Sequence, residues 1–279
     1  MSGIQVVADS ACDLPDEILG EFGIDVVPLT ICFGDEEYVD RRTLSPAEFW
    51  KLCSDSRVLP TTAAPAPGAF LDAFERARDA GKDGVVCVTM SSGISGTYQS
   101  AVKASEMLDS EFPVEVVDCR SITVAEGLVV LAAARAALDA APLDTVVSVA
   151  RSATGRLRGF VALDTLDNLK KGGRIGAAQA LFGSALSVKP IIKMEDGVVV
   201  GESRQRTRGR ALDYLVKTTK ALGEVEILGV THGDASDLDE FLRMVAGGFP
   251  DLEIVVSQMG AVLGAHVGEG AVCLATLVR

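Results

Sequence analysis

The turn at residues 91–97, SSGISGT, has the side chains and the position that anion binding requires. It follows an apolar run at residues 85–90 and precedes a predicted helix that begins near Thr97. At such a junction, free backbone N–H groups and the positive end of the helix dipole point at whatever lies above the turn. Serine hydroxyls add donors that rotate to fit a ligand. Ser95 is closest to the helix, and the supporting residues are Ser92, Gly93 and Gly96. Helix capping explains this turn equally well when it is taken alone.

A second pair of hydroxyls lies in a proline-rich segment. Thr61 and Thr62 stand within residues 59–68, where three prolines exclude a helix and stiffen the chain. A stiff loop can hold a hydroxyl in one place, so Thr62 is a candidate binding residue. Ordinary turn chemistry is the simpler explanation of this segment in isolation.

His266 lies in a glycine-rich apolar stretch at residues 259–270. A lone histidine in such a run is more often structural than functional. Here the glycines allow close backbone approach to a side chain that can change its charge near neutral pH, which favours a functional role. The other histidine, His232, precedes Gly233 and Asp234 and is typical of a helix-entry turn.

Alternating strands and helices must position these residues in the first half. The predicted strands are residues 4–8, 24–33, 85–90 and 114–118, and the predicted helices run from an N-cap at Asp13 to Gly23 and over residues 46–54, 69–80 and 97–108. Ser45 and Glu48 form a capping box around Pro46. Repeated strand–helix–strand units predict a parallel sheet with helices on both faces. Ligands bind at the carboxyl ends of such strands, where the serine turn lies.

Two predicted helices, at residues 126–141 and 143–152, connect the first half to a second half with a different pattern. In the second half, helices are predicted at residues 165–171, 207–221 and 236–246, and strands at 157–163, 188–194, 198–202, 227–230, 254–257 and 272–277. The sequence Glu195-Asp196-Gly197 between two strands predicts a tight hairpin, and therefore antiparallel pairing. We expect an α/β protein with a parallel-sheet domain at residues 1–155 and a mixed-sheet domain at residues 156–279.

Composition excludes several classes of function. The chain has 279 residues, 48% of them apolar, and a formal net charge of −13. That balance leaves no basic footprint for nucleic acid and disfavours more than transient contact with anionic membranes. No apolar run is long enough to cross a membrane, and the first residues show no secretory signal, so we expect a cytoplasmic protein. Six scattered cysteines without a Cys-x-x-Cys pair predict free structural thiols and no metal site.

Six segments, in order, resemble the signatures of the DegV family. They are residues 7–14 (VADSACDL, similar to TDSTxDL), 60–65 (PTTAAP, similar to PTTSQP), 91–101 (SSGISGTYQSA, similar to SSGLSGTYQSA), 169–175 (LKKGGRI, similar to LxKGGRI), 206–207 (RT) and 265–270 (AHVGEG, similar to AHxGxG). The segments span nearly the whole chain.

The resemblance implies a two-domain α/β protein that binds one long-chain fatty acid between its domains, with no other cofactor. It is similar to the binding subunit of bacterial fatty acid kinase. Such a subunit presents the carboxylate to a separate ATP-dependent kinase and carries the acyl phosphate toward phospholipid synthesis. By this resemblance, Thr62, Ser95 and His266 hold the carboxylate. Arg174 and Arg206 handle the phosphorylated head group or the kinase.

The residue types agree with these implied roles. Hydroxyls and an imidazole hold a carboxylate without the full ion pair of an arginine clamp, so its oxygen stays able to attack a phosphoryl donor. We expect the tail to lie along residues 175–188 and around Phe160, Leu181 and Phe182, although core packing explains each equally well. Ala63 and Ala64 replace a hydroxyl and an amide of the family pattern, which removes polar support beside Thr62.

Two other functions fit parts of the sequence. A serine hydrolase acting on a lipid ester would use Ser95 as nucleophile and His266 as base. The Gly-x-Ser-x-Gly elbow is missing, and the sequence places no acid to orient the histidine. A phosphate cradle for a nucleotide or phosphosugar would need a Gly-x-Gly-x-x-Gly or Walker pattern, which is absent.

Overall fold

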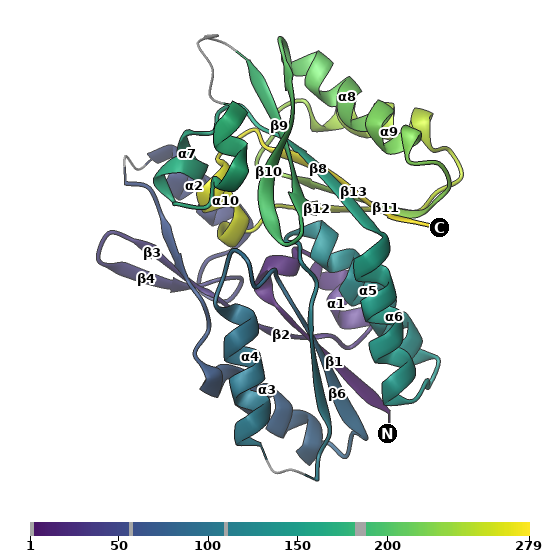
Figure 1. The fold of residues 1–279 in the computed structure, drawn as a ribbon. Helices are drawn as coiled ribbons and strands as arrows, with labels where there is room; N and C mark the ends of the chain where they lie inside the picture. Colours follow the sequence, from purple (N-terminus) through teal and green to yellow (C-terminus); the bar gives the residue numbers. More distant parts are fainter. Residues whose placement is uncertain (1–2, 56–57, 109–110, 182–187) are drawn as a thin grey trace.

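A computed structural model describes residues 3–55, 58–108, 111–181 and 188–279. It has an α/β fold built around two large sheets (Figure 1). The first sheet is parallel throughout, with the strand order β2-β1-β6-β7. Its strands are β1 (Ile4–Asp9), β2 (Asp25–Val27), β6 (Gly84–Thr89) and β7 (Val114–Asp118).

Helices cover both faces of this parallel sheet, as predicted. They are α1 (Asp16–Glu21), α3 (Pro67–Asp79), α4 (Thr97–Met107), α5 (Val124–Leu138) and α6 (Leu143–Arg156). Strand side chains alternate between the faces. Val7 packs with α3 and α4, while Val6 and Ala8 pack with α1, α5 and α6.

The second sheet is mixed, in the order β10-β9-β8-β13-β11-β12. Only β11 and β12 pair in parallel; the other neighbours are antiparallel. The strands are β8 (Leu157–Ala162), β9 (Lys189–Glu195), β10 (Val198–Gln205), β11 (Val225–His232), β12 (Ile254–Gln258) and β13 (Val272–Val278). Helices α8 (Arg208–Ala221) and α9 (Leu238–Gly248) pack on one face.

Helix α5 lies between the two sheets and joins their cores. Its first eight residues are buried on all sides, which is typical of an interior helix. The hydrophobic cluster around Leu128 includes Val86 from the parallel sheet and Ala275 from the mixed sheet. The halves predicted from the sequence therefore share one continuous core.

A third, small sheet stands beside the two large ones. It has the order β4-β3-β5 and contains β3 (Thr30–Phe33), β4 (Glu36–Val39) and β5 (Thr61–Ala63). Short helical elements lie around it: η1 (Ser10–Cys12), α2 (Pro46–Asp55), α7 (Asp167–Lys171), η2 (Gly176–Leu181) and α10 (Ala261–Val267).

Two predictions about this region are wrong. The expected strand at residues 24–33 is interrupted at Pro28, which has no N–H for a strand ladder, so β2 and β3 belong to different sheets. The proline-rich segment at residues 59–68 is not purely a loop, because β5 pairs with β3 and places Ile31 opposite Thr62. Its prolines flank this strand.

The predicted N-cap at Asp13 is also wrong. Asp13 lies in the left-handed region with φ 49°, and α1 begins only at Asp16. The Asp13 side chain is buried, and its carboxylate accepts hydrogen bonds from the Thr123 hydroxyl at 2.6 Å and the Gly260 N–H at 2.9 Å. Asp13 therefore fastens the start of α10 to the first half of the chain.

Two local signals are confirmed. In the capping box, the Glu48 carboxylate accepts hydrogen bonds from the Ser45 N–H and hydroxyl at 2.9 and 2.7 Å. In the hairpin turn, Asp196 and Gly197 both have positive φ, 48° and 79°, as a type I′ turn requires. The remaining predicted elements are found with shifted ends.

None of the helices in the described ranges has the length and apolar composition needed to cross a membrane. All six cysteines are free thiols; four are buried, and Cys32 and Cys53 are partly exposed. Across the part of the chain that the structure describes, no group of three or more His, Cys, Asp and Glu side chains is arranged to hold a metal ion.

Candidate functional site

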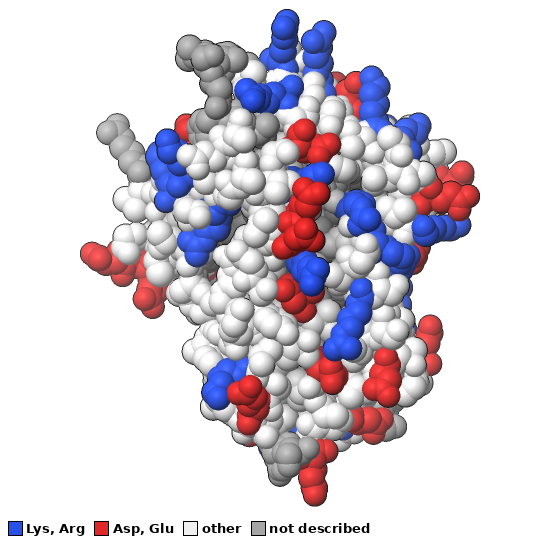
Figure 2. All heavy atoms as spheres, in the orientation of Figure 1, with Lys and Arg blue, Asp and Glu red and all other residues white. Residues whose placement is uncertain are grey.

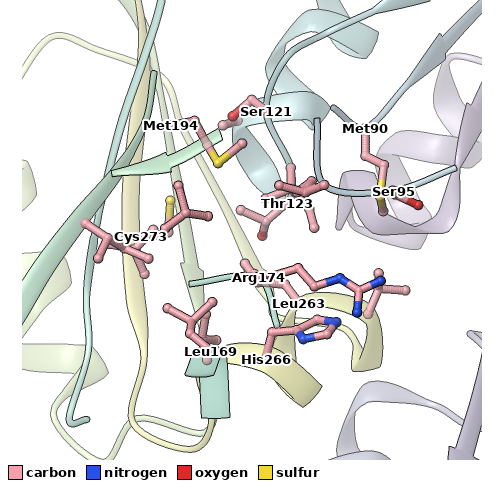
Figure 3. A pocket seen from close by; sticks show the side chains of 18 of the residues that line it. Met90, Ser95, Ser121, Thr123, Leu169, Arg174, Met194, Leu263, His266 and Cys273 are labelled. Atoms are coloured by element: carbon pink, nitrogen blue, oxygen red, sulfur yellow. The ribbon is translucent and has the colours of Figure 1, made fainter. Parts of the chain in front are cut away.

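A pocket lies where the serine turn, the mixed sheet and α10 meet (Figure 3). Most of its wall is apolar, formed by Leu29, Met90, Ile94, Ile122, Val161, Leu169, Ile192, Met194, Val199, Val262, Leu263 and Val267. The polar side chains among its lining residues are those of Thr62, Ser95, Ser121, Thr123, Arg174, Lys193 and His266. The pocket therefore combines a mostly apolar wall with a few polar groups, as small-molecule sites commonly do.

Thr62 and His266 lie together in this pocket although 204 residues separate them in the sequence. Thr62 Oγ1 is 3.2 Å from His266 Nε2. Strand β5 carries Thr62, and the last turn of α10 carries His266. The small sheet and α10 thus bring a hydroxyl and an imidazole to the same point on the pocket wall.

Of the three serines in the turn, only Ser95 lines the pocket. Its hydroxyl is 2.8 Å from Thr97 Oγ1 and accepts the Thr97 N–H at 3.3 Å. Ser92 instead donates to Asp118 at 2.5 Å, which ties the turn to β7. Ser91 donates to the Gly197 carbonyl at 2.6 Å. The turn's serines therefore divide between one pocket residue and two that hold the turn in place.

Gly93 is where the hairpin turn approaches the serine turn most closely. A Cβ atom on Gly93 would lie 2.4 Å from the Gly197 carbonyl oxygen, closer than side-chain carbons approach. Gly96 also lines the pocket, beside Ala64. A side chain at Gly93 would therefore clash with the hairpin, whereas a Cβ at Gly96 would make only an ordinary van der Waals contact with Ala64.

His266 is neutral in the environment that the structure gives it. Burial, and secondly the cationic Arg174 guanidinium, lower the pKa of His266 to about 4. Gly172 packs so closely that a Cβ there would lie 2.5 Å from His266 Nδ1. Because the ring is uncharged near neutral pH, it can offer a ligand a hydrogen bond but not an ion pair.

The two candidate arginines occupy different positions. Arg174 lines the pocket with an exposed side chain, and its guanidinium donates to the Gly172 carbonyl at 2.8 Å. Arg206 is exposed between β10 and α8 and is not among the lining residues. The structure thus brings Arg174 together with Thr62, Ser95 and His266, and places Arg206 outside the pocket.

Phe160 was predicted to line the tail region, and this prediction is wrong. On β8, Gly159 and Val161 face the pocket, so strand alternation directs Phe160 to the opposite face, where it packs with α8 and α9. Ile175 is partly buried against the core cluster beside the pocket. Phe182, like residues 183–187, lies outside the described residues, as does the Leu181 side chain.

Several pocket residues were missed by the sequence reasoning. Met90 directly follows β6, and Ser121 and Thr123 follow β7, so all three lie at the carboxyl edge of the parallel sheet. That edge was itself predicted, and residues after each strand could have been added to the candidates. Met194 and Cys273 come from strands of the mixed sheet, whose register the sequence does not reveal.

The two alanines that depart from the family pattern have different environments. Both are exposed, but Ala64 lines the pocket beside Gly96, whereas Ala63 pairs with Thr30 in the small sheet. The pocket wall next to Thr62 is therefore apolar at residue 64.

The arrangement does not form a catalytic triad. His266 Nε2 contacts Thr62, and the Ser95 hydroxyl contacts Thr97. Among the described residues, no group hydrogen-bonds to the buried Nδ1 of His266, so no acid orients its ring. The hydrolase alternative therefore lacks both the serine–histidine contact and the orienting carboxylate.

Comparison with known proteins gives consistent matches over the full chain. The model of the family described as uncharacterised protein, DegV family, matches residues 3–279. A DegV domain-containing protein of Listeria innocua is 35% identical over 280 residues, which cover 99% of each chain.

The fold is shared with solved structures of DegV family proteins. A DegV family protein from Thermus thermophilus, described by its fatty acid binding, has a TM-score of 0.91 and 27% identity, and the match covers 99% of this chain and 100% of the other. DegV from Bacillus subtilis, described as a fatty acid binding protein, has a TM-score of 0.90 and 29% identity, with 99% of each chain covered.

Proposed function

The chain belongs to the DegV family, and from that premise we propose that it binds one long-chain fatty acid in the pocket between its two large sheets. The observation that carries the proposal is the pocket itself, in which Thr62, Ser95 and His266 provide polar contacts at a mostly apolar wall. The fatty acid binding described for the Thermus and Bacillus relatives supports this ligand class.

In this proposal the three polar side chains hold the carboxylate. Hydroxyl groups of Thr62 and Ser95 donate hydrogen bonds to its oxygens, and the neutral His266 ring donates through Nε2 when its proton is on that nitrogen. Hydrogen bonds to a charged acceptor are stronger than those between neutral groups. Arg174, at the same pocket, adds a positive field that favours the ionised acid.

The apolar wall supplies most of the affinity. Burial of apolar surface contributes about 0.8 kcal/mol per CH₂, so a ~16-carbon tail offers on the order of 10 kcal/mol before ordering costs. Three neutral hydrogen-bonding groups then serve chiefly to fix the position of the head group. A ligand with the same tail and no carboxylate is expected to bind more weakly.

We further propose that the protein presents the acid to a separate ATP-dependent fatty acid kinase. A carboxylate oxygen attacks the terminal phosphorus of ATP, an O–P bond forms, and ADP leaves, so that the carrier holds the acyl phosphate for phospholipid synthesis. Arg174 is placed to meet the added phosphate charge. Arg206, exposed outside the pocket, is available to the kinase. This role places the protein in the cytoplasm and treats residues 1–155 and 156–279 as domains on either side of the ligand.

A binding titration tests the carboxylate site. Delipidated protein is titrated with hexadecanoic acid, and the Ser95→Ala variant is compared with Ser100→Ala, which alters a serine of α4 outside the pocket lining. Loss of one hydrogen bond to a charged group predicts roughly tenfold weaker binding for Ser95→Ala. No uptake of any long-chain acid by the wild-type protein would refute the proposal.

The kinase step has its own test. Arg174→Ala and Arg206→Ala variants are expected to bind hexadecanoic acid but to form acyl phosphate more slowly with a cognate kinase and ATP. Equal rates for both variants and the wild type would remove the two arginines from this role while leaving fatty acid binding intact.

A further inference from the structure

A second cavity, here called the groove, lies against the far end of the fatty acid pocket. It is formed by the end of β7, the junction between α6 and β8, and the β9–β10 hairpin. Its lining residues include Tyr98, Asp118, Arg120, Ser121, Arg151, Thr154, Arg158, Gly159, Lys193, Met194, Glu195 and Asp196. In Figure 2, basic side chains gather on the face between the hairpin and α6, with acidic side chains among them.

The pocket and the groove share one wall. Ser121, Gly159, Lys193 and Met194 border both cavities. In Figure 3, Ser121 and Met194 lie at the end of the pocket opposite His266, Leu169 and Arg174. The shared wall therefore lies at the tail end of the pocket, away from the proposed carboxylate site.

Three of the four residues in this wall are partly exposed, and the fourth, Ser121, is 6% exposed. Gly159 has no side chain, and Met194 has a flexible one. Gly159, Lys193 and Met194 are each only half-buried, whereas Thr123 and Cys273 in the body of the pocket are 1% exposed. A fully sealed tail end would instead be closed by buried, branched or aromatic side chains.

Of the four cationic side chains that line the groove, two have a carboxylate partner and two have none among the described residues. Lys193 pairs with Glu202, and Arg151 pairs with Glu115. Arg158 donates only to the carbonyls of residues 155 and 157, and for both Arg158 and Arg120 the guanidinium forms no ion pair with any described residue. In a chain of net charge −13, two unpaired guanidinium groups beside one cavity favour an anionic occupant.

We propose that the groove receives the far end of the ligand, and that the ligands therefore include long-chain acids with a second carboxylate at the ω end. The inference rests on the proposed function, because the first carboxylate must occupy the site at Thr62, Ser95 and His266. The chain then runs along the apolar wall and passes Gly159 and Met194. The ω-carboxylate lies beside Arg120 and Arg158.

A pocket with an open tail end and one with a closed tail end differ strongly in the free energy of binding a dicarboxylic acid. Burying an ionised carboxylate without a partner in an apolar cavity is strongly unfavourable, so a closed pocket rejects a dicarboxylic acid. An open end that leads to solvent and two guanidinium groups removes this penalty. Short dicarboxylic acids gain nothing, because their second carboxylate remains in the apolar part of the pocket.

The test compares hexadecanoic, hexadecanedioic and octanedioic acids with delipidated full-length protein. We expect dissociation constants for the two long acids within about tenfold of each other, and no measurable binding of the short diacid. Tight hexadecanoic acid binding with at least roughly a thousandfold weaker hexadecanedioic acid binding would overturn the inference while leaving the proposed function in place. Failure of both long acids to bind would refute the proposed function itself.

Variants locate the second carboxylate. In the Arg120→Gln/Arg158→Gln double variant, hexadecanedioic acid is expected to bind roughly tenfold more weakly while hexadecanoic acid binding is unchanged. Arg210→Gln/Arg243→Gln, a double variant at exposed positions of α8 and α9, serves as the charge-matched control. An equal effect of the double variant on both acids, or no effect on the diacid, would show that the groove does not receive it.

Discussion

At the scale of single residues, the charge of His266 determines whether it holds a carboxylate by a hydrogen bond or by an ion pair. Burial and the nearby Arg174 lower its pKa to about 4, so the free protein presents a neutral ring. A neutral ring leaves the ligand's carboxylate without a paired positive charge at that point. In the proposed function, the carboxylate oxygen then keeps its electron density for attack on a phosphoryl donor.

The protonation of His266 can be followed directly, because the chain has only two histidines. As the pH is lowered, the ring signals in NMR spectra are expected to show that His266 stays neutral down to about pH 4. The Arg174→Ala variant is expected to have a higher His266 pKa, because a nearby cation is removed. His232→Gln assigns the two signals. A His266 midpoint above about pH 6.5 in the folded wild type would contradict the neutral-ring account.

The Thr62 hydroxyl is tested by an isosteric change. Thr62→Val keeps the shape and removes the hydroxyl beside His266, so hexadecanoic acid is expected to bind roughly tenfold more weakly. The control is Thr61→Val, which alters an exposed neighbour on the same short strand. Equal affinities for the two variants would show that Thr62 does not contact the ligand.

At this scale, the sequence predicted a group of residues whose members come together in space. Thr62, Ser95, Arg174 and His266 all line one pocket. The assignment depended on recurring family segments, because spacing alone could not bring together residues 204 positions apart. The face of Phe160 was mispredicted, since two adjacent residues on a strand differ only in the side they face.

At the scale of elements, the β9–β10 hairpin holds the serine turn in place. Gly197 accepts a hydrogen bond from Ser91, and the Gly197 carbonyl leaves no room for a side chain at Gly93. The turn residues of the hairpin predicted the hairpin itself. The sequence did not predict that the hairpin contacts the serine turn. Long-range docking of this kind depends on how two sheets are placed, which local patterns do not specify.

Gly93→Ala measures this contact. The added methyl would lie 2.4 Å from the Gly197 oxygen, so the hairpin or the turn must move. We expect a loss of about 1 to 3 kcal/mol in unfolding free energy and weaker fatty acid binding. In Gly209→Ala the new Cβ meets nothing within 4 Å, and that variant should be at least as stable as the wild type. A fully stable Gly93→Ala variant with normal binding would refute the docking account.

A buried group of acids connects η1 to α10. Burial raises the pKa of Asp9 and of Asp13 to about 7 and that of Asp40 to about 6. At pH values between the ordinary pKa of 3.8 and these raised pKa values, the three carboxyl groups keep their protons in the folded state and lose them in the unfolded chain. The stability that these acids contribute is therefore present at low pH and is lost as the pH rises through about 6 to 7.

The pH dependence of unfolding tests this group. His266 has the opposite sign, because its lowered pKa makes folding less favourable as the pH falls from 6.5 to about 4. The combined effect of the three acids on stability is larger than that of His266. Urea unfolding should therefore give a lower free energy of unfolding at about pH 8 than at about pH 5. Asp40→Asn should make the dependence shallower. A rise in stability over the same range in the wild type would contradict the raised pKa values.

At the scale of the whole molecule, the fold class and most elements were predictable, but the division into halves is less sharp than the sequence indicates. The predicted boundary lies at the α6–β8 junction, yet the core cluster around α5 contains residues from both sheets. The alanine-rich composition of residues 126–141 predicted a helix that connects the halves. It could not show that both sheets pack against the same helix.

The shared core predicts cooperative unfolding. Thermal unfolding is expected to give one transition that coincides in far-ultraviolet circular dichroism and in the fluorescence of Trp50, the single tryptophan. Trp50 is 4% exposed and donates to the Met259 carbonyl at 2.9 Å, so its signal reports a contact between the halves. Two separated transitions would show that the halves unfold independently.

Native mass spectrometry of the freshly purified protein tests the central claim most directly. The account predicts one adduct with the mass of a long-chain fatty acid, which is lost on denaturation and regained when delipidated protein is mixed with the acid. A Thr62→Val/Ser95→Ala variant should retain less of this adduct than a Thr61→Val/Ser100→Ala control. A protein that carries no such adduct and takes up no long-chain acid after delipidation would contradict the account.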